Sequence, residues 1–240
     1  MSQAIGHIEI LPDPLALARH VAEWMTEAAR AARGPFRVSL SGGSTPKALY
    51  SLLPADGFRP RFPWQLVSWY WGDERFVPYD HPESNYGMAR EAMLADAPVP
   101  PENIHPVPVD GTPEDAARRY ERTLQKAYGA ATLDPARPLF DVTLLGLGSD
   151  GHTASLLPGE AVLRERKRWV SVVSHGRPEI RITMTYPVIE SSRRVAFLVA
   201  GSEKAAILQK IRNGDSQAPA ARVRPRGELF WFVDRAAAGK

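Results

Sequence analysis

The pair most able to do chemistry in this sequence is an aspartate and a histidine two residues apart. Asp150 and His152 lie in the glycine-rich stretch GLGSDGHTASLLPG, residues 146–159, directly after the apolar run 140–145. A short apolar run is typical of a buried strand, and the carboxyl ends of strands in open α/β sheets are where ligands bind. Histidine, with an ordinary pKa near ~6.5, can accept a proton at neutral pH. The pair therefore indicates general acid–base catalysis, with His152 as the base.

The role of Asp150 stays open at this level. It could hold the imidazole in one tautomer and stabilise its charged form, as carboxylates do in hydrolases. Residues two apart do not share a face of a helix, so a direct bond to His152 does not follow from the spacing. Asp150 could instead contact the substrate or cap a following helix. A lone histidine is more often structural, but the neighbouring acid and the three glycines favour a functional pair.

A second segment has the features of an anion site. Residues 41–47, SGGSTPK, lie between a predicted strand at 36–40 and a helix predicted to begin at 45–46. Gly42 and Gly43 expose backbone N–H groups, Ser44 and Thr45 add hydroxyls, and the positive end of the helix points to the same place. The segment matches neither a Walker loop nor GxGxxG. It predicts phosphate binding, with a plain strand-to-helix turn as the alternative.

Two further segments supply charged side chains after predicted strands. In WGDERF, residues 71–76, the planar fork of Arg75 can clamp a phosphate or carboxylate, and Asp73 can orient it or bind substrate hydroxyls. In residues 199–205 Ser202 is the predicted N-cap, which places Lys204 in the first turn. The helix dipole does not favour a cation there, so a bound anion explains Lys204 better. The alternatives are a salt-bridged turn and a solvated lysine.

These segments need a scaffold that brings strand ends together, and the rest of the sequence predicts one. Strands and helices alternate along the chain, which is typical of an α/β fold. We expect one Rossmann-like domain over residues 1–240, with a mostly parallel β-sheet flanked by helices. Strands are predicted at 36–40, 66–71, 104–107, 140–145, 169–173, 181–185, 195–199 and 229–233. Helices are predicted to begin at 13–14 (ending at Gly34), 45–46, 84, 112–114 and 202.

Composition excludes several classes of site. The 240 residues contain no cysteine, so disulfides, thiol nucleophiles and thiolate metal sites are excluded, and a reducing cytoplasm is indicated. Neither a membrane span nor a signal peptide is evident. The net charge is +3, and the cluster Arg222, Arg224 and Arg226 is interpreted as a solvated loop rather than a nucleic-acid surface, because no aromatic pattern accompanies it.

The candidate residues favour a hydrolase that forms no covalent intermediate with its substrate. The six histidines have no metal-ligand spacing, and no G-x-S-x-G elbow is present. One imidazole base among several cations suits direct attack of water on an activated, phosphorylated substrate.

Together the segments resemble the 6-phosphogluconolactonase family, within the glucosamine-6-phosphate isomerase/6-phosphogluconolactonase superfamily. The resemblance covers nearly the whole chain, and its markers are SGGSTP (41–46), GDER (72–75), SN (84–85), GLGSDGHTAS (146–155), RIT (181–183), GSEKA (201–205) and WFVD (231–234). It implies a single Rossmann-like domain that hydrolyses 6-phospho-D-glucono-1,5-lactone to 6-phospho-D-gluconate in the oxidative pentose phosphate pathway. The reaction that the resemblance implies needs no metal or organic cofactor. We expect a cytoplasmic monomer or weak homo-oligomer, acting on this small substrate without nucleic acid or membrane.

The resemblance also implies residue roles. His152 would activate water against the lactone carbonyl and Asp150 would orient the site, while Ser44, Thr45, Arg75 and Lys204 would hold the phosphate and nearby oxygens. Two alternatives remain. The deaminase branch, acting on glucosamine 6-phosphate, carries a Glu shortly after the histidine, where this chain has Leu157. A non-catalytic sugar-phosphate sensor would need a DNA-binding module, for which the chain leaves no room.

Overall fold

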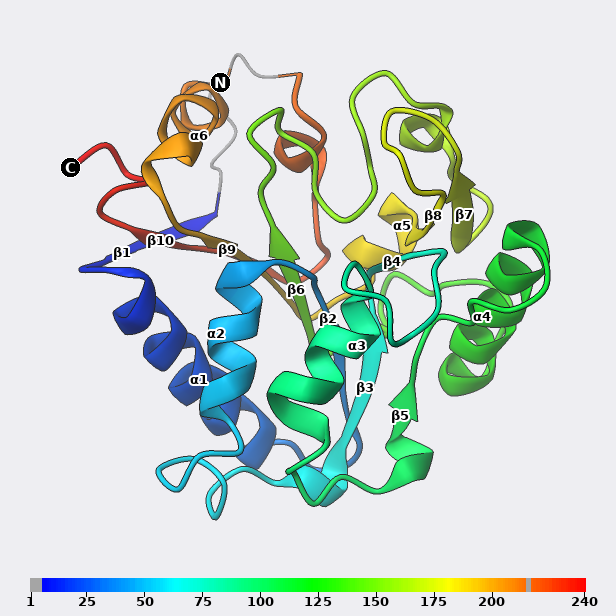
Figure 1. Cartoon of the computed structure of the whole chain (residues 1–240), viewed down its shortest axis with the longest axis horizontal. Coiled ribbons are helices and arrows are strands. Elements are labelled where there is room, and N and C mark those ends of the chain that lie inside the picture. Colours follow the sequence, from blue (N-terminus) through cyan, green and yellow to red (C-terminus); the bar gives the residue numbers. More distant parts are fainter. Residues whose placement is uncertain (1–5, 215–216) are drawn as a thin grey trace.

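The computed structural model describes residues 6–214 and 217–240, which fold around a seven-stranded sheet (Figure 1). Every neighbouring pair of strands in it is parallel. The spatial order is β1 (His7–Leu11), β10 (Glu228–Asp234), β9 (Arg194–Val199), β6 (Val142–Gly146), β2 (Phe36–Leu40), β3 (Val67–Trp71) and β5 (Ile104–His105). The prediction of an α/β fold with a mostly parallel sheet is confirmed.

The strand order reverses beside β2. The chain runs from β2 through β3 to β5 at one edge and then returns to place β6 on the other side of β2. Strands β2 and β6 pair only at Val38–Val142 and Ser39–Thr143, whereas β2 and β3 pair as far as Leu40–Trp71. The two central strands therefore stop pairing before their carboxyl ends. Such a switch point is where open parallel sheets form a ligand crevice.

The helices of the described ranges are α1 (Pro14–Arg30), α2 (Ser44–Leu52), α3 (Asn85–Ala89), α4 (Pro113–Tyr128), α5 (Tyr186–Glu190) and α6 (Ala205–Arg212). Three of these six helices, α1, α3 and α4, begin directly after the capping residues that the sequence predicts. Asp13, Ser84 and Thr112 each accept a backbone N–H of the first turn. The predicted end of the first helix at Gly34 is wrong, because α1 stops at Arg30 with Ala31 as its C-cap.

Short helical turns occupy several connections between these elements. A π-helical turn spans Arg90–Leu94, and 3₁₀ turns span Trp64–Leu66, Pro101–Asn103, Ala161–Arg164, Ser202–Lys204 and Pro219–Arg222. The last two of these turns lie close to the glycine-rich segments of the predicted site.

A second sheet is a feature that the sequence did not separate from the first. Strands β4 (Asp73–Arg75), β8 (Arg181–Met184) and β7 (Val170–Val173) form a three-stranded antiparallel sheet against which α4 packs. The connection between β7 and β8 is residues 174–180. That is too short for the crossover that parallel strands need, so the two strands must pair antiparallel. The small sheet places β4 beside the switch point (Figure 1), and the 174–180 loop reaches Asp150 through Arg177.

The core consists of the parallel strands and the helix faces on them. Trp69, Trp71 and Trp231 are almost completely buried, and the rings of Phe197 and Trp231 stack 3.9 Å apart on neighbouring strands. Strands buried on both faces are apolar almost throughout, which is why they were evident in the sequence. Across residues 6–214 and 217–240, no helix combines the length and apolar character that crossing a membrane requires.

Candidate active site

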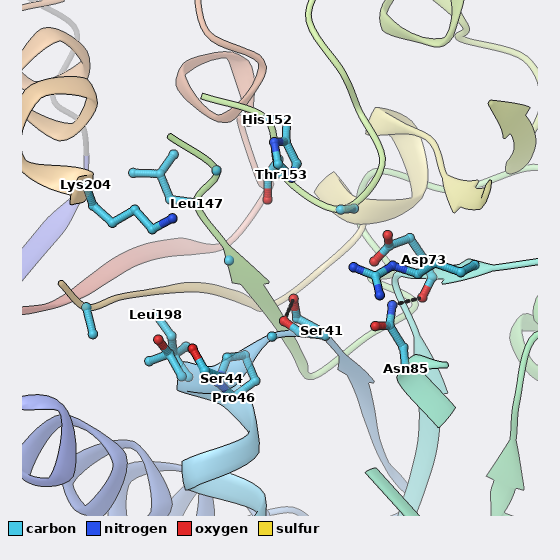
Figure 2. A pocket seen from close by; sticks show the side chains of 18 of the residues that line it. Ser41, Ser44, Pro46, Asp73, Asn85, Leu147, His152, Thr153, Leu198 and Lys204 are labelled. Atoms are coloured by element: carbon cyan, nitrogen blue, oxygen red, sulfur yellow. Dashed lines mark hydrogen bonds between the residues drawn. The ribbon is translucent and has the colours of Figure 1, made fainter. Parts of the chain in front are cut away.

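A cavity of about 240 Å³ opens at the carboxyl ends of β2, β3, β6 and β9. Its lining includes all the predicted site residues except Asp150, namely Gly42, Gly43, Ser44, Thr45, Asp73, Arg75, His152 and Lys204. Figure 2 shows Lys204 on one side, Asp73 and Asn85 on the other, and His152 above them. Four segments far apart in the sequence thus meet because parallel strands share one carboxyl edge.

Asp150 stands behind His152 and contacts it directly. Its Oδ1 lies 2.5 Å from His152 Nδ1 and 3.1 Å from the His152 backbone nitrogen. A tight turn makes this contact possible: Gly148 N–H donates to the His152 carbonyl at 2.9 Å, and Gly151 has a left-handed φ of +84°. No helix follows the turn, so Asp150 is not a helix cap. With Nδ1 donating to the carboxylate, Nε2 is the imidazole nitrogen left for the reaction.

The carboxylate of Asp150 is held in its ionised form. Partial burial raises its pKa, but hydrogen bonds from Arg177 and His152 outweigh burial and hold the pKa well below its usual range. The Arg177 Nη2 atom donates to Asp150 Oδ2 at 2.6 Å. An ionised partner on Nδ1 stabilises the imidazolium that forms when His152 takes a proton.

The predicted anion loop has the geometry of a phosphate site. Gly43, with a φ of +106°, precedes Ser44 at the start of α2, and no side chain caps the helix. Its first N–H groups therefore remain available to an anion. Gly42 is required for space, since a Cβ there would lie 1.9 Å from Asn85 Oδ1.

A buried tyrosine fixes this loop to the sheet. Tyr50, on α2, accepts the N–H of Ser41 at 2.9 Å and donates its hydroxyl to the Ser41 carbonyl at 2.8 Å. Both backbone groups belong to the point where the chain leaves β2. The hydroxyl therefore replaces the ladder bonds that end there.

Tyr50→Phe is expected to destabilise the protein by about 2–6 kcal/mol, because it leaves two buried backbone groups unpaired at roughly 1–3 kcal/mol each. Denaturant unfolding would measure the loss. A change below about 0.5 kcal/mol would contradict the anchoring role of the hydroxyl.

Two arginines face each other across the small sheet. Arg75 on β4 pairs in register with Arg181 on β8, and both line the cavity. Glu83 holds Arg75 through its carbonyl at 2.7 Å and its carboxylate at 3.0 Å. Arg181 is buried, and its nearest carboxylate, on Glu179, lies 3.6 Å away. Burial and the charge of Arg75 lower the pKa of Arg181. Like charges opposite one another are unfavourable, so the pair indicates a bound anion.

The acidic side of the cavity is fixed by hydrogen bonds. Ser155 donates to Asp73 Oδ2 at 2.6 Å, and Asn85 Nδ2 donates to the Asp73 carbonyl at 2.9 Å. Glu74 does not line the cavity. It is buried and accepts three backbone N–H groups, two from the start of α3; burial raises its pKa to about 7, although these bonds oppose the rise. Glu74 therefore fastens β4 to α3, while Asp73 faces the ligand space.

A strained residue follows the histidine. Ala154, with a φ of 46°, is the only non-glycine residue with left-handed backbone in the described parts of the chain. Strain of this kind concentrates at functional sites. Ala154 lies between Thr153 and Ser155. Ser155 binds Asp73. Thr153 lines the cavity, and its buried hydroxyl has no hydrogen-bond partner among the described residues. Thr153 thus offers a hydroxyl to a ligand.

Lys204 reaches the cavity from a 3₁₀ turn. Ser202 is not the N-cap that the sequence predicted, because Gly201 with a φ of +99° precedes the turn Ser202–Lys204. The carboxylate of Asp234 accepts the Gly201 N–H at 3.2 Å and so ties the turn to the end of β10. The nearest carboxylate, on Glu203, is 3.8 Å from Lys204 Nζ, which leaves the ammonium group available to an anion.

Sequence reasoning did not select three cationic or polar groups of this site. Arg181 lies in a motif of the family resemblance but was not assigned a role, and Thr153 follows the histidine without a signal of its own. Arg177 belongs to a loop with no recognisable pattern. In the described ranges, no three His, Cys, Asp or Glu side chains are grouped so that they could hold a metal ion.

Comparison with known proteins finds matches to one family over most of the chain. Residues 12–231 match the family of glucosamine-6-phosphate isomerases/6-phosphogluconolactonase. The chain is 42% identical to a 6-phosphogluconolactonase of Nostoc sp. over 96% of both chains, and 39% identical to that of Rattus norvegicus over 98% of this chain and 93% of the relative. The structure of 6-phosphogluconolactonase from Trypanosoma cruzi superposes with a TM-score of 0.84 at 33% identity, covering 98% of this chain and 96% of the other.

Proposed function

The chain belongs to the glucosamine-6-phosphate isomerase/6-phosphogluconolactonase family, and on that premise we propose that it hydrolyses 6-phospho-D-glucono-1,5-lactone to 6-phospho-D-gluconate. Relatives named 6-phosphogluconolactonase match it over nearly their whole length. The observation that carries the proposal is the ionised Asp150 bonded to His152 above a cavity lined by Arg75, Arg181 and Lys204. A base beside several cations suits a phosphorylated, already activated ester.

The reaction uses His152 first as a base and then as an acid. Nε2 takes a proton from water, whose oxygen attacks the lactone carbonyl carbon, and the carbonyl oxygen becomes an oxyanion. When the tetrahedral intermediate collapses, the bond between the carbonyl carbon and the ring oxygen breaks. The ring oxygen then receives the proton from the imidazolium. Asp150 stabilises the imidazolium throughout, and positioning by the phosphate site adds to the ~10²–10⁴-fold that such proton transfer supplies.

The phosphate group binds at the start of α2 in this proposal. Ser44 and Thr45 provide N–H and hydroxyl donors beside Gly42 and Gly43, and Lys204 provides a charge. Arg75 and Arg181 hold nearby oxygens, and Asp73 accepts hydrogen bonds from substrate hydroxyls. The two like-charged arginines opposite each other on β4 and β8 and the uncapped helix start support these roles.

Lys204→Ala is expected to raise KM by roughly 10- to 100-fold, because a hydrogen bond to a charged group contributes about 1.5–3 kcal/mol. The effect on kcat is expected to be smaller, since Lys204 does not contact His152. Steady-state kinetics with the phosphorylated lactone would measure both. Lys210→Ala, at the exposed far end of α6, is the matched control. An unchanged KM with a collapsed kcat would contradict the anchoring role.

The glutamate that the deaminase alternative requires is replaced by a leucine in this chain. Leu157 stands where the resemblance places the glutamate of that branch, and it is buried in the core outside the cavity lining. A leucine cannot transfer a proton. A sugar-phosphate sensor would not need an ionised partner for His152, so the Asp150–His152 pair favours the enzyme.

Proton release from freshly generated 6-phosphogluconolactone tests the proposed activity. Unphosphorylated gluconolactone and glucosamine 6-phosphate serve as controls for the phosphate and for the deaminase branch. We expect acceleration well above spontaneous hydrolysis for the phosphorylated lactone alone. A rate equal to the spontaneous one would overturn the proposal, and ammonia release from glucosamine 6-phosphate would establish the alternative.

The proposal includes the wider context of the enzyme. We infer one domain over residues 1–240, supported by a single core cluster and one family match. We expect neither nucleic acid nor a membrane to take part. The bonds of Arg222 to Gln217 and of Arg224 to the Ala221 and Val223 carbonyls support a loop that is not a nucleic-acid surface. The exposed large hydrophobic side chains of the described ranges, Leu15, Leu66 and Ile180, lie on separate elements, which supports a monomer or weak homo-oligomer. Light scattering and cell fractionation would test the oligomeric state and the cytoplasmic location.

A further inference from the structure

An arginine that does not line the cavity lies against the catalytic pair. Arg177 belongs to the loop 174–180 between β7 and β8. Its Nη2 lies 2.6 Å from Asp150 Oδ2 and 3.3 Å from His152 Nδ1. Its Nη1 donates to the Gly176 carbonyl at 2.7 Å, which fixes the guanidinium within its own loop.

Each oxygen of Asp150 therefore has its own partner. Oδ1 accepts from the imidazole, and Oδ2 accepts from the guanidinium. Because Nδ1 carries the proton that it donates to Asp150, the 3.3 Å approach of Arg177 to Nδ1 joins two donors. Arg177 acts on the imidazole there through its charge rather than through a hydrogen bond.

We propose that Arg177 is a positioning residue, which orients the Asp150 carboxylate toward His152 and opposes protonation of the imidazole before water is activated. The proposal rests on the function of His152 as the base. Without Arg177 the carboxylate would lose the bond that orients it, although its bonds to His152 keep it beside the imidazole, and the positive charge near the imidazole would be gone. Both changes affect His152 although Arg177 touches no substrate.

The other charges around His152 are expected to stay the same in a variant of Arg177. Asp150 is its direct partner, and the cavity lining adds Asp73, Arg75, Arg181, Glu203 and Lys204. None of these side chains bonds to Arg177 except Asp150. A shift in the titration of His152 on replacing Arg177 would therefore report the loss of this one charge and its bond.

The test is an NMR titration of the histidine rings in ¹⁵N-histidine-labelled protein, comparing the wild type with Arg177→Gln and Arg177→Lys. His152→Ala identifies the His152 signal, and Arg30→Gln, at the exposed end of α1, is the control. We expect the titration midpoint of His152 to rise by about one pH unit in Arg177→Gln, because a neighbouring positive charge has been removed. Arg177→Lys should return it most of the way.

The pH profile of kcat/KM gives the second readout. Its acid limb should move to higher pH with the His152 midpoint in Arg177→Gln, and kcat on the plateau should fall by about tenfold as the orientation of the pair is lost. An unchanged midpoint together with an unchanged acid limb would overturn the proposal. The NMR midpoint does not depend on turnover, so failure of the wild type to hydrolyse the lactone would overturn the proposed function while this measurement still decides the role of Arg177.

Discussion

His152→Ala is expected to lower kcat by about 10²- to 10⁴-fold, the usual contribution of a general acid–base residue. KM should change little, because the groups proposed to hold the phosphate, the N-terminus of α2 and Lys204, remain in place. The Asp150 carboxylate keeps its bond from Arg177, so the variant does not leave an unpaired charge. Stopped-flow proton release, corrected for spontaneous hydrolysis, measures the loss.

The matched control is His7→Ala, on the edge strand β1, which should retain wild-type turnover. Binding of 6-phospho-D-gluconate by calorimetry separates catalysis from binding, and the affinity of His152→Ala should stay within a few-fold of the wild type. A variant that keeps more than about a tenth of the wild-type kcat would show that His152 is not the base.

The second large effect is expected from replacing a glycine that leaves space for the catalytic pair. A Cβ on Gly148 would lie 2.0 Å from His152 Nδ1 and 2.7 Å from Asp150 Oδ1. Gly148→Ala must therefore displace the imidazole or its partner. Because a misplacement of about 1 Å can cost 10²-fold in rate, we expect kcat to fall by at least about that factor.

The expected signature of Gly148→Ala is lost turnover with preserved phosphate binding, measured by the same kinetics and calorimetry. Gly57→Ala is the control, since a Cβ at Gly57 meets nothing within 4 Å and should leave kcat unchanged. Thermal unfolding of both variants shows whether the fold is retained. Full activity in Gly148→Ala would mean that the contact between Asp150 and His152 is not needed for catalysis.

The elements of the fold were largely predictable because their signals are local. The apolar runs at 36–40, 140–145 and 195–199 are strands of the parallel sheet, and Asp13, Ser84 and Thr112 cap helices. Strands buried on both faces leave a continuous apolar pattern. The antiparallel pairing of 170–173 with 181–184 was not predicted, although the short connection between these two strands already requires it.

The sequence by itself identified most of the polar and charged residues that line the cavity. Gly42 to Thr45, Asp73, His152 and Lys204 each follow a predicted strand, and parallel strands deliver such residues to one edge. Only the tertiary structure decided how they cooperate. The bond of Asp150 to His152 depends on the turn at Gly151, and the approach of Arg177 and Arg181 depends on a second sheet formed by residues far away in sequence. Spacing along a chain fixes neighbours within one element, whereas contacts between elements are set by how the sheets and loops pack.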